Sequence, residues 1–167
     1  MTFRDATPAD ASAIDAVFRE SFKATFAHLY AREDLASFLD RFTVEGWAAE
    51  IADPAFAFRV LEDADGIAGY CKLGPISLPA TPEGPAIELR QLYLLERAKG
   101  SGAAQALMDW ALATARARGA TELWLSVYID NHRAKRFYER YGFEDRGPYA
   151  FMVGNHADED RLMRLAL

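Results

Sequence analysis

The sequence contains only one cysteine, Cys71, which lies in the apolar run IAGYCKLG. A single cysteine excludes an intramolecular disulfide framework, and its apolar neighbours predict a buried, unreactive thiol. The three histidines, His28, His132 and His156, are scattered and lack the spacing of ligands in a zinc or iron site. The sequence therefore predicts no metal.

Long apolar runs are also lacking, since no segment approaches the roughly 20 apolar residues that cross a bilayer. The chain begins without the basic and apolar stretches of a secretory signal, so we expect a cytoplasmic protein that does not bind membranes. A formal net charge of -6 argues against nonspecific binding to nucleic acid, which requires a basic surface. The same charge weakly favours cationic partners.

The composition, with 51% hydrophobic and 26% charged residues in a chain of 167, is typical of a globular protein. A chain of this length fits one domain, residues 1–167, with one core. Hydrophobic periodicity and turn signals predict mixed strands and helices without an internal repeat. The predicted strands span residues 3–7, 55–63, 66–76, 86–95, 120–129, 147–153 and 160–167. The predicted helices span about residues 8–26, 33–42, 43–51, 102–118 and 131–142, with cap signals at Thr7-Pro8 and Thr43.

The segment LYLLERAKGSGAAQALMDWAL runs from a predicted strand through a glycine-containing loop into a helix. Glycines permit close backbone approach, and the exposed amides at a helix start form an anion site for which phosphate is the natural guest. A tight turn that needs glycine only for its geometry explains the same pattern. The GxxxxGK[ST] pattern of phosphate-loop NTPases is absent, and Gln105 stands where the dinucleotide pattern GxGxxG has its third glycine.

The segment NHRAKRFYERYGF, residues 131–143, predicts a short helix. Asn131 or Asp130 can cap this helix, Gly142 can end it in a left-handed turn, and Phe143 can fold back onto the core. One helix face, with the spacing i, i+3, i+4, i+7, carries Ala134, Phe137, Tyr138 and Tyr141. Taken alone, this stripe favours a packing role for Tyr138, because aromatic stripes usually belong to a core.

The two segments together, in this order, resemble the GNAT superfamily of acetyl-coenzyme A-dependent N-acetyltransferases. The coenzyme loop of the superfamily, [QR]xxGx[GA], is matched by Lys99-x-x-Gly102-x-Ala104, which sets the adjoining strand and helix at the usual distance. Arg97-x-x-Gly100-x-Gly102 is the alternative placement. Lys99 departs from the usual Gln or Arg, and Ala104 from the more frequent Gly. The second coenzyme pattern, NxxAxxFYxxxGF, is matched without exception by the helical segment described above.

The resemblance covers residues 87–143 and implies the GNAT fold, an α/β (α+β) architecture. The family has a mixed, mostly antiparallel central sheet with flanking helices, here splayed between the strands at about 86–95 and 120–129. Acetyl-coenzyme A, the co-substrate, is expected to bind in that splay. By resemblance, its binding residues are Leu92, Tyr93, Leu94, Lys99, Gly100, Ser101, Gly102, Ala103, Ala104, Gln105, Asn131, Ala134, Phe137 and Tyr138.

Acetyl transfer requires a neutral amine, because a primary amine with a pKa near ~10.4 is almost fully protonated at pH 7. By resemblance, Tyr138 is the general acid that protonates the leaving thiolate. Glu88 shares a strand face with Leu92 and Leu94 and is the candidate general base, or else a structural carboxylate paired with Arg90. We expect the amide of Leu94 to polarise the thioester carbonyl. The family layout places acceptor contacts at Phe26, His28, Tyr30 and Asp34.

Two further segments, ESFKATFAHLYAREDLASFL and FMVGNHADEDRLMRLAL, resemble bacterial spermidine/spermine acetyltransferases of the PaiA type. The leading expectation is therefore acetylation of a small primary amine such as a polyamine. A peptide or protein amine is the alternative acceptor, although Ser126 stands where peptide N-terminal acetyltransferases often have Glu. A GNAT module that binds acyl-coenzyme A without turnover is a further alternative. Small members of the superfamily often form homodimers, and the resemblance extends that expectation to this chain.

Overall fold

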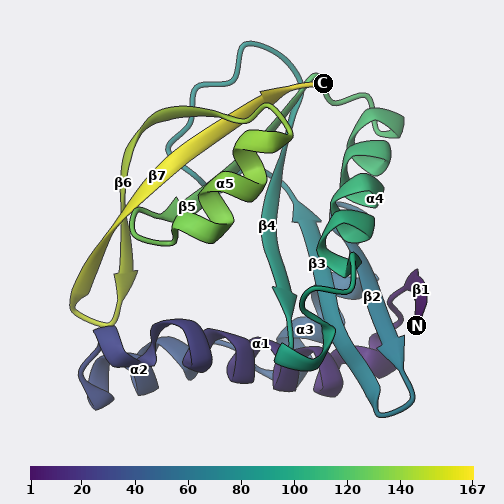
Figure 1. The fold of residues 1–167 in the computed structure, drawn as a ribbon, viewed down its shortest axis with the longest axis vertical. Helices are drawn as coiled ribbons and strands as arrows, with labels where there is room; N and C mark the ends of the chain where they lie inside the picture. Colours follow the sequence, from purple (N-terminus) through teal and green to yellow (C-terminus); the bar gives the residue numbers. More distant parts are fainter.

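The computed structural model describes all 167 residues and contains one seven-stranded sheet with helices on both faces (Figure 1). The strands are β1 (Thr2–Asp5), β2 (Ala57–Asp63), β3 (Gly66–Gly74), β4 (Ala86–Leu94), β5 (Glu122–Tyr128), β6 (Glu144–Val153) and β7 (His156–Ala166). The α-helices are α1 (Ala11–Phe26), α2 (Arg32–Leu39), α3 (Val44–Ala52), α4 (Ala103–Ala117) and α5 (His132–Arg140). Short 3-10 helices lie at Pro8–Asp10, Ala27–Leu29 and Glu96–Ala98. No helix is long and apolar enough to span a bilayer.

The strands follow the spatial order β1-β2-β3-β4-β5-β7-β6. All neighbouring strands are antiparallel except β4 and β5, which are parallel and pair only at residues 86–88 and 122–124. Beyond these three pairs the two strands diverge (Figure 1). The predicted fold is therefore confirmed, including the mixed, mostly antiparallel sheet and its splay.

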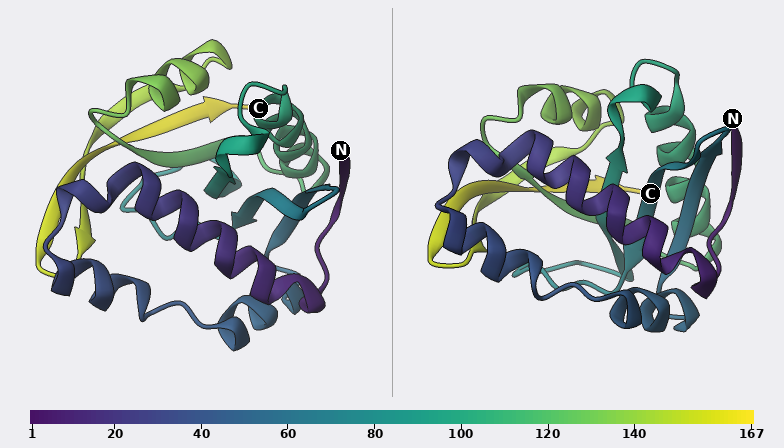
Figure 2. Two further views of the ribbon diagram at one scale, coloured as in Figure 1. Left: turned by 60° about the horizontal axis from the view of Figure 1, so that its bottom comes forward. Right: turned by 90° about the horizontal axis from the view of Figure 1, so that it is seen from below.

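Two hydrophobic cores lie on opposite faces of the sheet, where the sequence predicted one. Helices α1, α2 and α3 cover one face and contribute Phe18, Phe22, Phe38 and Trp47 among others (Figure 2). Helices α4 and α5 cover the other face, where Leu107 is fully buried. The prediction was wrong because α1 and α4 pack on opposite faces of the same strands, so that β3 is buried at seven consecutive positions.

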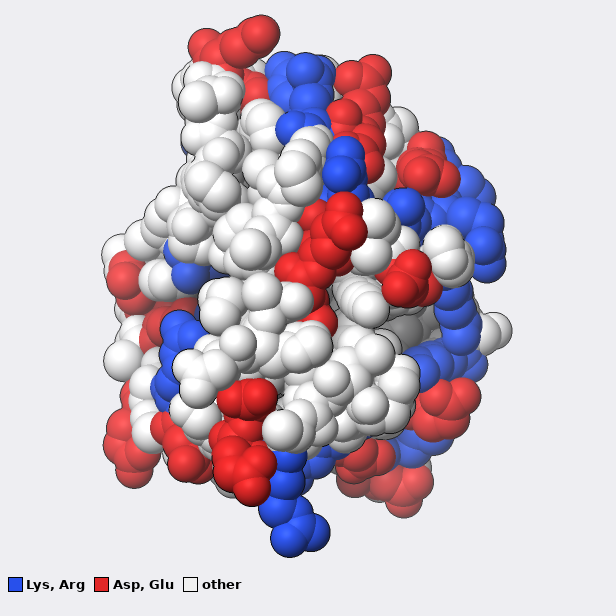
Figure 3. Space-filling view, turned by 90° about the vertical axis from the view of Figure 1, so that its left-hand side faces the viewer, with Lys and Arg blue, Asp and Glu red and all other residues white.

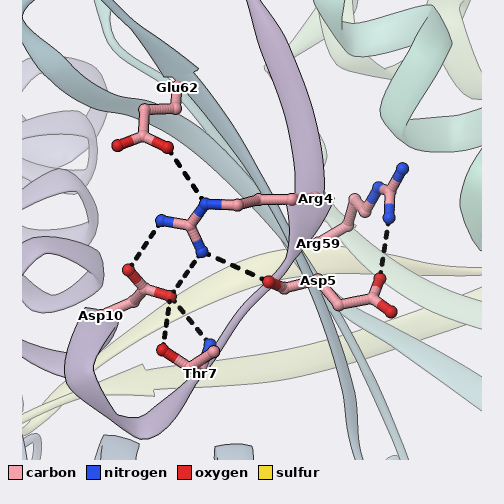
Figure 4. Close-up of polar contacts among 6 residues, drawn as sticks. All are labelled: Arg4, Asp5, Thr7, Asp10, Arg59 and Glu62. Carbon is pink, nitrogen blue, oxygen red and sulfur yellow. Dashed lines mark hydrogen bonds and ion pairs between the residues drawn. The ribbon is translucent and has the colours of Figure 1, made fainter.

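An ion-pair network fixes the start of the chain against the sheet (Figure 4). The Arg4 guanidinium donates to Glu62 Oε2 at 3.0 Å and to both Asp10 oxygens at 2.8 and 2.9 Å. Asp10 Oδ2 also accepts from the Thr7 amide at 2.8 Å, across the predicted start signal. The hydrogen bond from Arg4 lowers the pKa of Asp10 to about 2. The network joins β1, the first turn of the helical region and β2.

Several element ends differ from their predicted positions. Helix α2 ends at Leu39 because residues 40–42 form turns instead of continuing the helix. The strands predicted at 55–63 and 66–76 begin and end two residues closer to their hairpin turn, at Ala57 and Gly74. Strands β6 and β7 are longer than predicted because they form one continuous hairpin, which Gly154 closes with a φ of +58°. Cys71 is fully buried, as predicted, and burial raises the pKa of its thiol.

Candidate active site

A cleft of about 1000 Å³ opens where β4 and β5 diverge. Residues 89–94 of β4 form one wall, and residues 125–128 of β5 form the other. Side chains from α1, α5, β6 and β7 complete the lining. Figure 3 shows the face that lies at the left of Figure 1, where acidic side chains (red) border a hollow near the middle of the view.

The connection from β4 to α4 exposes backbone amides. Gly100 and Gly102 have φ values of +75° and +84°, in the left-handed region that favours glycine. The amides of Gly100, Ser101 and Gly102 donate no hydrogen bond within the chain, and the first amides of α4 have no acceptor inside the helix. A Cβ atom on either glycine would meet nothing within 4 Å. The loop therefore presents several free donors to open space, as an anion site requires.

Five of the seven loop residues predicted to bind the coenzyme line the cleft, namely Lys99, Gly100, Gly102, Ala104 and Gln105. The side chains of the other two are used elsewhere. The Ser101 hydroxyl donates to the Ala98 carbonyl at 2.6 Å, and the Ala103 side chain is buried. Lys99 Nζ pairs with Glu96 at 2.8 Å.

Three arginines of α5 line the same cleft, and the sequence interpretation did not include them. Arg133, Arg136 and Arg140 have the spacing i, i+3, i+7 and therefore share one helix face. Lys99 lowers the pKa of Glu96, and Arg133 lies close enough to the loop to contribute to this shift. Together with Lys99, these side chains make this end of the cleft cationic. Their spacing was the signal in the sequence that could have identified them.

Helix α5 has the predicted local structure. Asn131 caps it, because the side-chain oxygen accepts from the Ala134 amide at 3.3 Å. Gly142 follows the helix with a φ of +96°, and Phe143 is buried in the core beneath α4 and α5. Asn131, Ala134 and Phe137 also line the cleft. The capping pattern thus aligns one face of the helix with the opening between the strands.

Tyr138 has both environments that the sequence left open. Its ring packs against Phe137 at 5.4 Å and Phe143 at 5.7 Å between centroids, and it belongs to the boundary of the core. It also lines the cleft. Burial raises the pKa of Tyr138 above its ordinary value, so the phenol is protonated at neutral pH. A protonated hydroxyl at a cleft wall is chemically suited to donate a proton.

The wall formed by β4 includes the three predicted residues Leu92, Tyr93 and Leu94. The Leu95 amide donates to the carbonyl of Ala68, a residue of β3, at 2.8 Å. Because successive amides of an extended strand point to opposite sides, the Leu94 amide points away from β3 and toward the splay. The strand edge there is open to a ligand.

Glu88 lies outside the residues that line the cleft. Its side chain is buried, and Oε1 accepts from the Ser77 amide at 2.8 Å and from the Ser77 hydroxyl at 2.9 Å. The alternative pairing with Arg90 is not formed, since Arg90 donates to the Pro75 carbonyl and packs on Phe56. Glu88 therefore fastens the connection after β3 to the closed end of the splay.

The four predicted acceptor residues are distributed over three places. Phe26 and Tyr30 line the cleft, and the Tyr30 hydroxyl donates to Asp158. His28 is exposed and lines a smaller adjoining cavity of about 270 Å³. Asp34 accepts from the Asn155 amide at 2.9 Å and so ties α2 to the β6–β7 turn. Only the first two residues face the same space as Tyr138.

Asp160, on β7, is a cleft residue that the sequence interpretation missed. It is 6% exposed, and burial, followed by the nearby Asp158 charge, raises its pKa to about 7. Asp158 also contacts His156, whose Nε2 lies 3.1 Å from Oδ1. No group of three or more His, Cys, Asp or Glu side chains is arranged to hold a metal ion. The alternation Asp158, Asp160, Leu162 placed both carboxylates on one strand face and was the available signal.

Comparisons with known proteins agree with this arrangement. A family model described as the acetyltransferase (GNAT) family matches residues 15–143. An uncharacterized N-acetyltransferase of Mycobacterium bovis is 36% identical over 155 residues, which cover 92% of this chain and 96% of that protein.

Solved structures also share the fold. The PaiA N-acetyltransferase of Thermoplasma acidophilum, in complex with coenzyme A, has a TM-score of 0.80 at 22% identity, covering 99% of this chain and 98% of that one. The Salmonella typhimurium protein yncA, solved with its cofactor acetyl-CoA, has a TM-score of 0.76 at 20% identity, covering 100% and 94%. The chain therefore belongs to the acetyltransferase (GNAT) family and is an acetyl-coenzyme A-dependent N-acetyltransferase.

Proposed function

We propose that the protein transfers an acetyl group to a primary amine of a small cationic molecule, with polyamines as the leading acceptors. The observation that carries this proposal is the single cleft between β4 and β5, which has free amides and cationic side chains at one end and buried carboxylate and tyrosine side chains at the other. The first end suits a phosphorylated donor, and the second suits an amine.

The coenzyme half of the proposal rests on the loop and on α5. The free amides of Gly100, Ser101 and Gly102 are suited to hold the pyrophosphate. Lys99 and the arginines of α5 are suited to the remaining phosphate charge. Bound acetyl-coenzyme A supplies an activated acetyl thioester. The open edge of β4 is suited to pair with its pantetheine arm, and the Leu94 amide to donate to the thioester carbonyl.

Tyr138 is proposed as the general acid. Its raised pKa keeps the hydroxyl protonated at neutral pH, and the side chain lines the cleft beside β4. The conjugate acid of the leaving thiolate has an ordinary pKa near ~8.5, below that of the phenol. Proton transfer from Tyr138 to the sulfur therefore depends mainly on the position of the hydroxyl beside the sulfur. Of the two candidate bases, Glu88, predicted from sequence, lies outside the cleft and accepts from Ser77, whereas Asp160 lines the cleft.

The preference for a polyamine rests on four supports. The formal charge of -6 favours cationic partners, and the acceptor end of the cleft contains the buried Asp160. A structural neighbour is named PaiA N-acetyltransferase. Ser126 supplies no carboxylate to hold a protein N-terminus, which disfavours the peptide alternative. The cytoplasmic location and the homodimer stay predictions.

Thiol release from acetyl-coenzyme A, measured with spermidine, spermine and a peptide with a free N-terminus as separate acceptors, tests the proposal. Saturable release with a polyamine is the expected result. Release with the peptide alone would overturn the polyamine assignment and leave the acetyltransferase. If none of a wider panel of amines is acetylated and calorimetry still detects coenzyme binding, the chain is a binding module.

A further inference from the structure

Asp160 occupies the centre of the acceptor end of the cleft. In the sheet it lies directly between Tyr128 of β5 and Tyr149 of β6, its register partners on the two neighbouring strands. Directly opposed residues of antiparallel strands project to the same face, so these two tyrosines flank the carboxylate. Asp160 is only 6% exposed, yet it lines the cleft. Its carboxylate therefore lies at the wall of the cleft with little exposure to solvent.

No cation of the protein pairs with this carboxylate. The arginines of β7 are engaged elsewhere, Arg161 with Asp145 at 2.8 Å and Arg164 with Glu122. Asp158 is also buried, but Tyr30 donates to it and His156 contacts it. Asp160 forms no ion pair with any lysine, arginine or histidine. A buried carboxylate without a cation is costly unless a ligand supplies the missing charge.

The titratable groups that face Asp160 come from every element around it. They are Asp158 on the same strand, Tyr30 after α1, Tyr93 on β4, Tyr128 on β5 and Tyr149 on β6. All of these groups are acids, and the four phenols are neutral at pH 7, since an ordinary phenol has a pKa near ~10 and the pKa of each of these is raised. The Ser126 side chain is the hydrogen-bonding neighbour that favours the ionised form of Asp160. Arg41, which follows α2, also lines the cleft and acts on Tyr149, but it forms no ion pair with Asp160. The acidic groups around Asp160 therefore favour the binding of a positive group.

We propose that Asp160 binds the ammonium group of the acceptor and takes its proton, an inference that rests on the proposed function. In this step one N–H bond of the ammonium breaks and its electron pair stays on nitrogen. The proton bonds to a carboxylate oxygen of Asp160, which leaves a neutral amine beside a neutral carboxylic acid. Asp160 later returns the proton to water at the mouth of the cleft. The neutral amine is then the nucleophile that acetyl transfer requires.

The burial of Asp160 makes this proton transfer feasible. Desolvation lowers the pKa of an amine and raises that of a carboxylic acid, so it narrows the gap between the two pKa values and makes transfer of the proton from the bound ammonium less costly. The pKa of Asp160, about 7, already lies well above that of an ordinary aspartate, ~3.9, and closer to that of the amine. Glu88 lacks this position, since Ser77 satisfies one of its oxygens and it does not line the cleft.

The first test compares Asp160→Asn with Glu159→Gln. Glu159 precedes Asp160 on β7, is exposed and projects to the opposite strand face, so the control removes one carboxylate charge without altering the cleft. We expect Asp160→Asn to lower kcat/KM for the best amine by ~100-fold to 10,000-fold, the range for a general base. Coenzyme affinity, measured by calorimetry, is expected to stay unchanged in both variants, which also reports that both fold.

The pH profile provides a readout that a structural role would not change. In the natural protein kcat/KM for the amine is expected to rise with pH through about 7, the pKa of Asp160, and this limb is expected to vanish in Asp160→Asn. A limb that persists in Asp160→Asn would overturn the proposal. If the rise of kcat/KM with pH is lost in Glu88→Gln and kept in Asp160→Asn, the proposal is also overturned, and Glu88 is the base.

A second test does not depend on turnover. Carbon-13 spectra of the aspartate carboxyl groups, with Asp160 assigned by difference from Asp160→Asn, follow its titration in the free protein and with saturating spermidine. We expect a pKa near 7 that spermidine lowers, because a bound ammonium stabilises the carboxylate. An ordinary aspartate pKa, or one that spermidine leaves unchanged, would overturn the proposal. If no amine is acetylated at all, the proposed function fails, and this titration still decides whether Asp160 is a cation site.

Discussion

Glu122, the first residue of β5, forms an ion pair with Arg164 of β7, and their side chains are 2% and 18% exposed. Glu122 Oε2 also accepts from the amides of Glu83 and Gly84 at 2.7 and 2.8 Å. One buried carboxylate thus joins β5, β7 and the proline-rich connection before β4. These contacts lie at the closed end of the splay, where β4 and β5 still pair.

Glu122→Gln is expected to lower the free energy of unfolding by about 2 to 3 kcal/mol. The cost is below that of breaking a fully buried pair because Arg164 keeps some contact with water. Chemical denaturation measures this difference. Glu144→Gln, which disrupts an exposed pair with Arg146, is the control and is expected to change stability by less than about 1 kcal/mol. Equal stability of the two variants would contradict the structural role of Glu122.

The same carboxylate predicts an acid dependence of stability. Burial opposes ionisation of Glu122, but the hydrogen bonds from Arg164, Gly84 and Glu83 outweigh it and lower its pKa in the folded state. Its contribution is therefore fully present above the ordinary pKa of glutamate, ~4.3, and is lost as the pH falls through the lower folded value. Thermal unfolding between pH 3 and pH 6 should show a smaller dependence on pH in Glu122→Gln than in the natural protein.

Tyr138→Phe is expected to slow turnover by up to ~100-fold while coenzyme affinity stays the same. The ring contacts with Phe137 and Phe143 remain, and only the hydroxyl is removed. Steady-state kinetics and calorimetry measure the two quantities. Tyr141→Phe removes a hydroxyl that lies 3.2 Å from Asp109, outside the cleft, and should leave turnover unchanged. Unchanged turnover in Tyr138→Phe would assign Tyr138 to core packing alone.

Gly102→Ala and Gly119→Ala form a matched pair. Both glycines have a positive φ, +84° and +82°, and an added Cβ would meet no atom within 4 Å at either position. Each substitution is therefore expected to cost about 1 to 2 kcal/mol through backbone strain alone. Only Gly102→Ala should also weaken coenzyme binding, because its strain falls on the loop with free amides. Equal coenzyme affinity of both variants would contradict a coenzyme-binding role for the loop.

Asp158→Asn is expected to move the acid limb of the pH profile to lower pH. The Asp158 charge raises the pKa of Asp160, so its removal lowers that pKa. Asp160 would then be ionised at a pH where the natural protein has it protonated. The ratio of kcat/KM at pH 6 to that at pH 8 should rise in the variant. A limb that remains near pH 7 would show that the two carboxylates are not coupled.

The half of the cleft that we propose binds the coenzyme was predictable because its signals are local. Asn131 caps α5, Gly142 ends it, and the glycines of the loop have the required backbone conformation. The acceptor half was not predictable in the same way. Asp160 reaches the cleft only because β7 inserts between β5 and β6. The hydrophobic periodicity of a sequence predicts strands but does not predict their order in the sheet. In the sequence it stands in the charged run DEDR, whose members normally face water.

The three residue pairs between β4 and β5 have a mechanical consequence. The sheet consists of two parts, β1 to β4 and β5 to β7, which are joined only by these three residue pairs. Helix α1 runs across both parts of the sheet (Figure 2). The ring of Phe18 packs on Tyr93 of β4 at 5.8 Å, and the ring of Phe26 packs on Tyr128 of β5 at 6.0 Å, measured between ring centroids. Helix α1 therefore bridges the opening, and a change in its length or rigidity would change the width of the cleft.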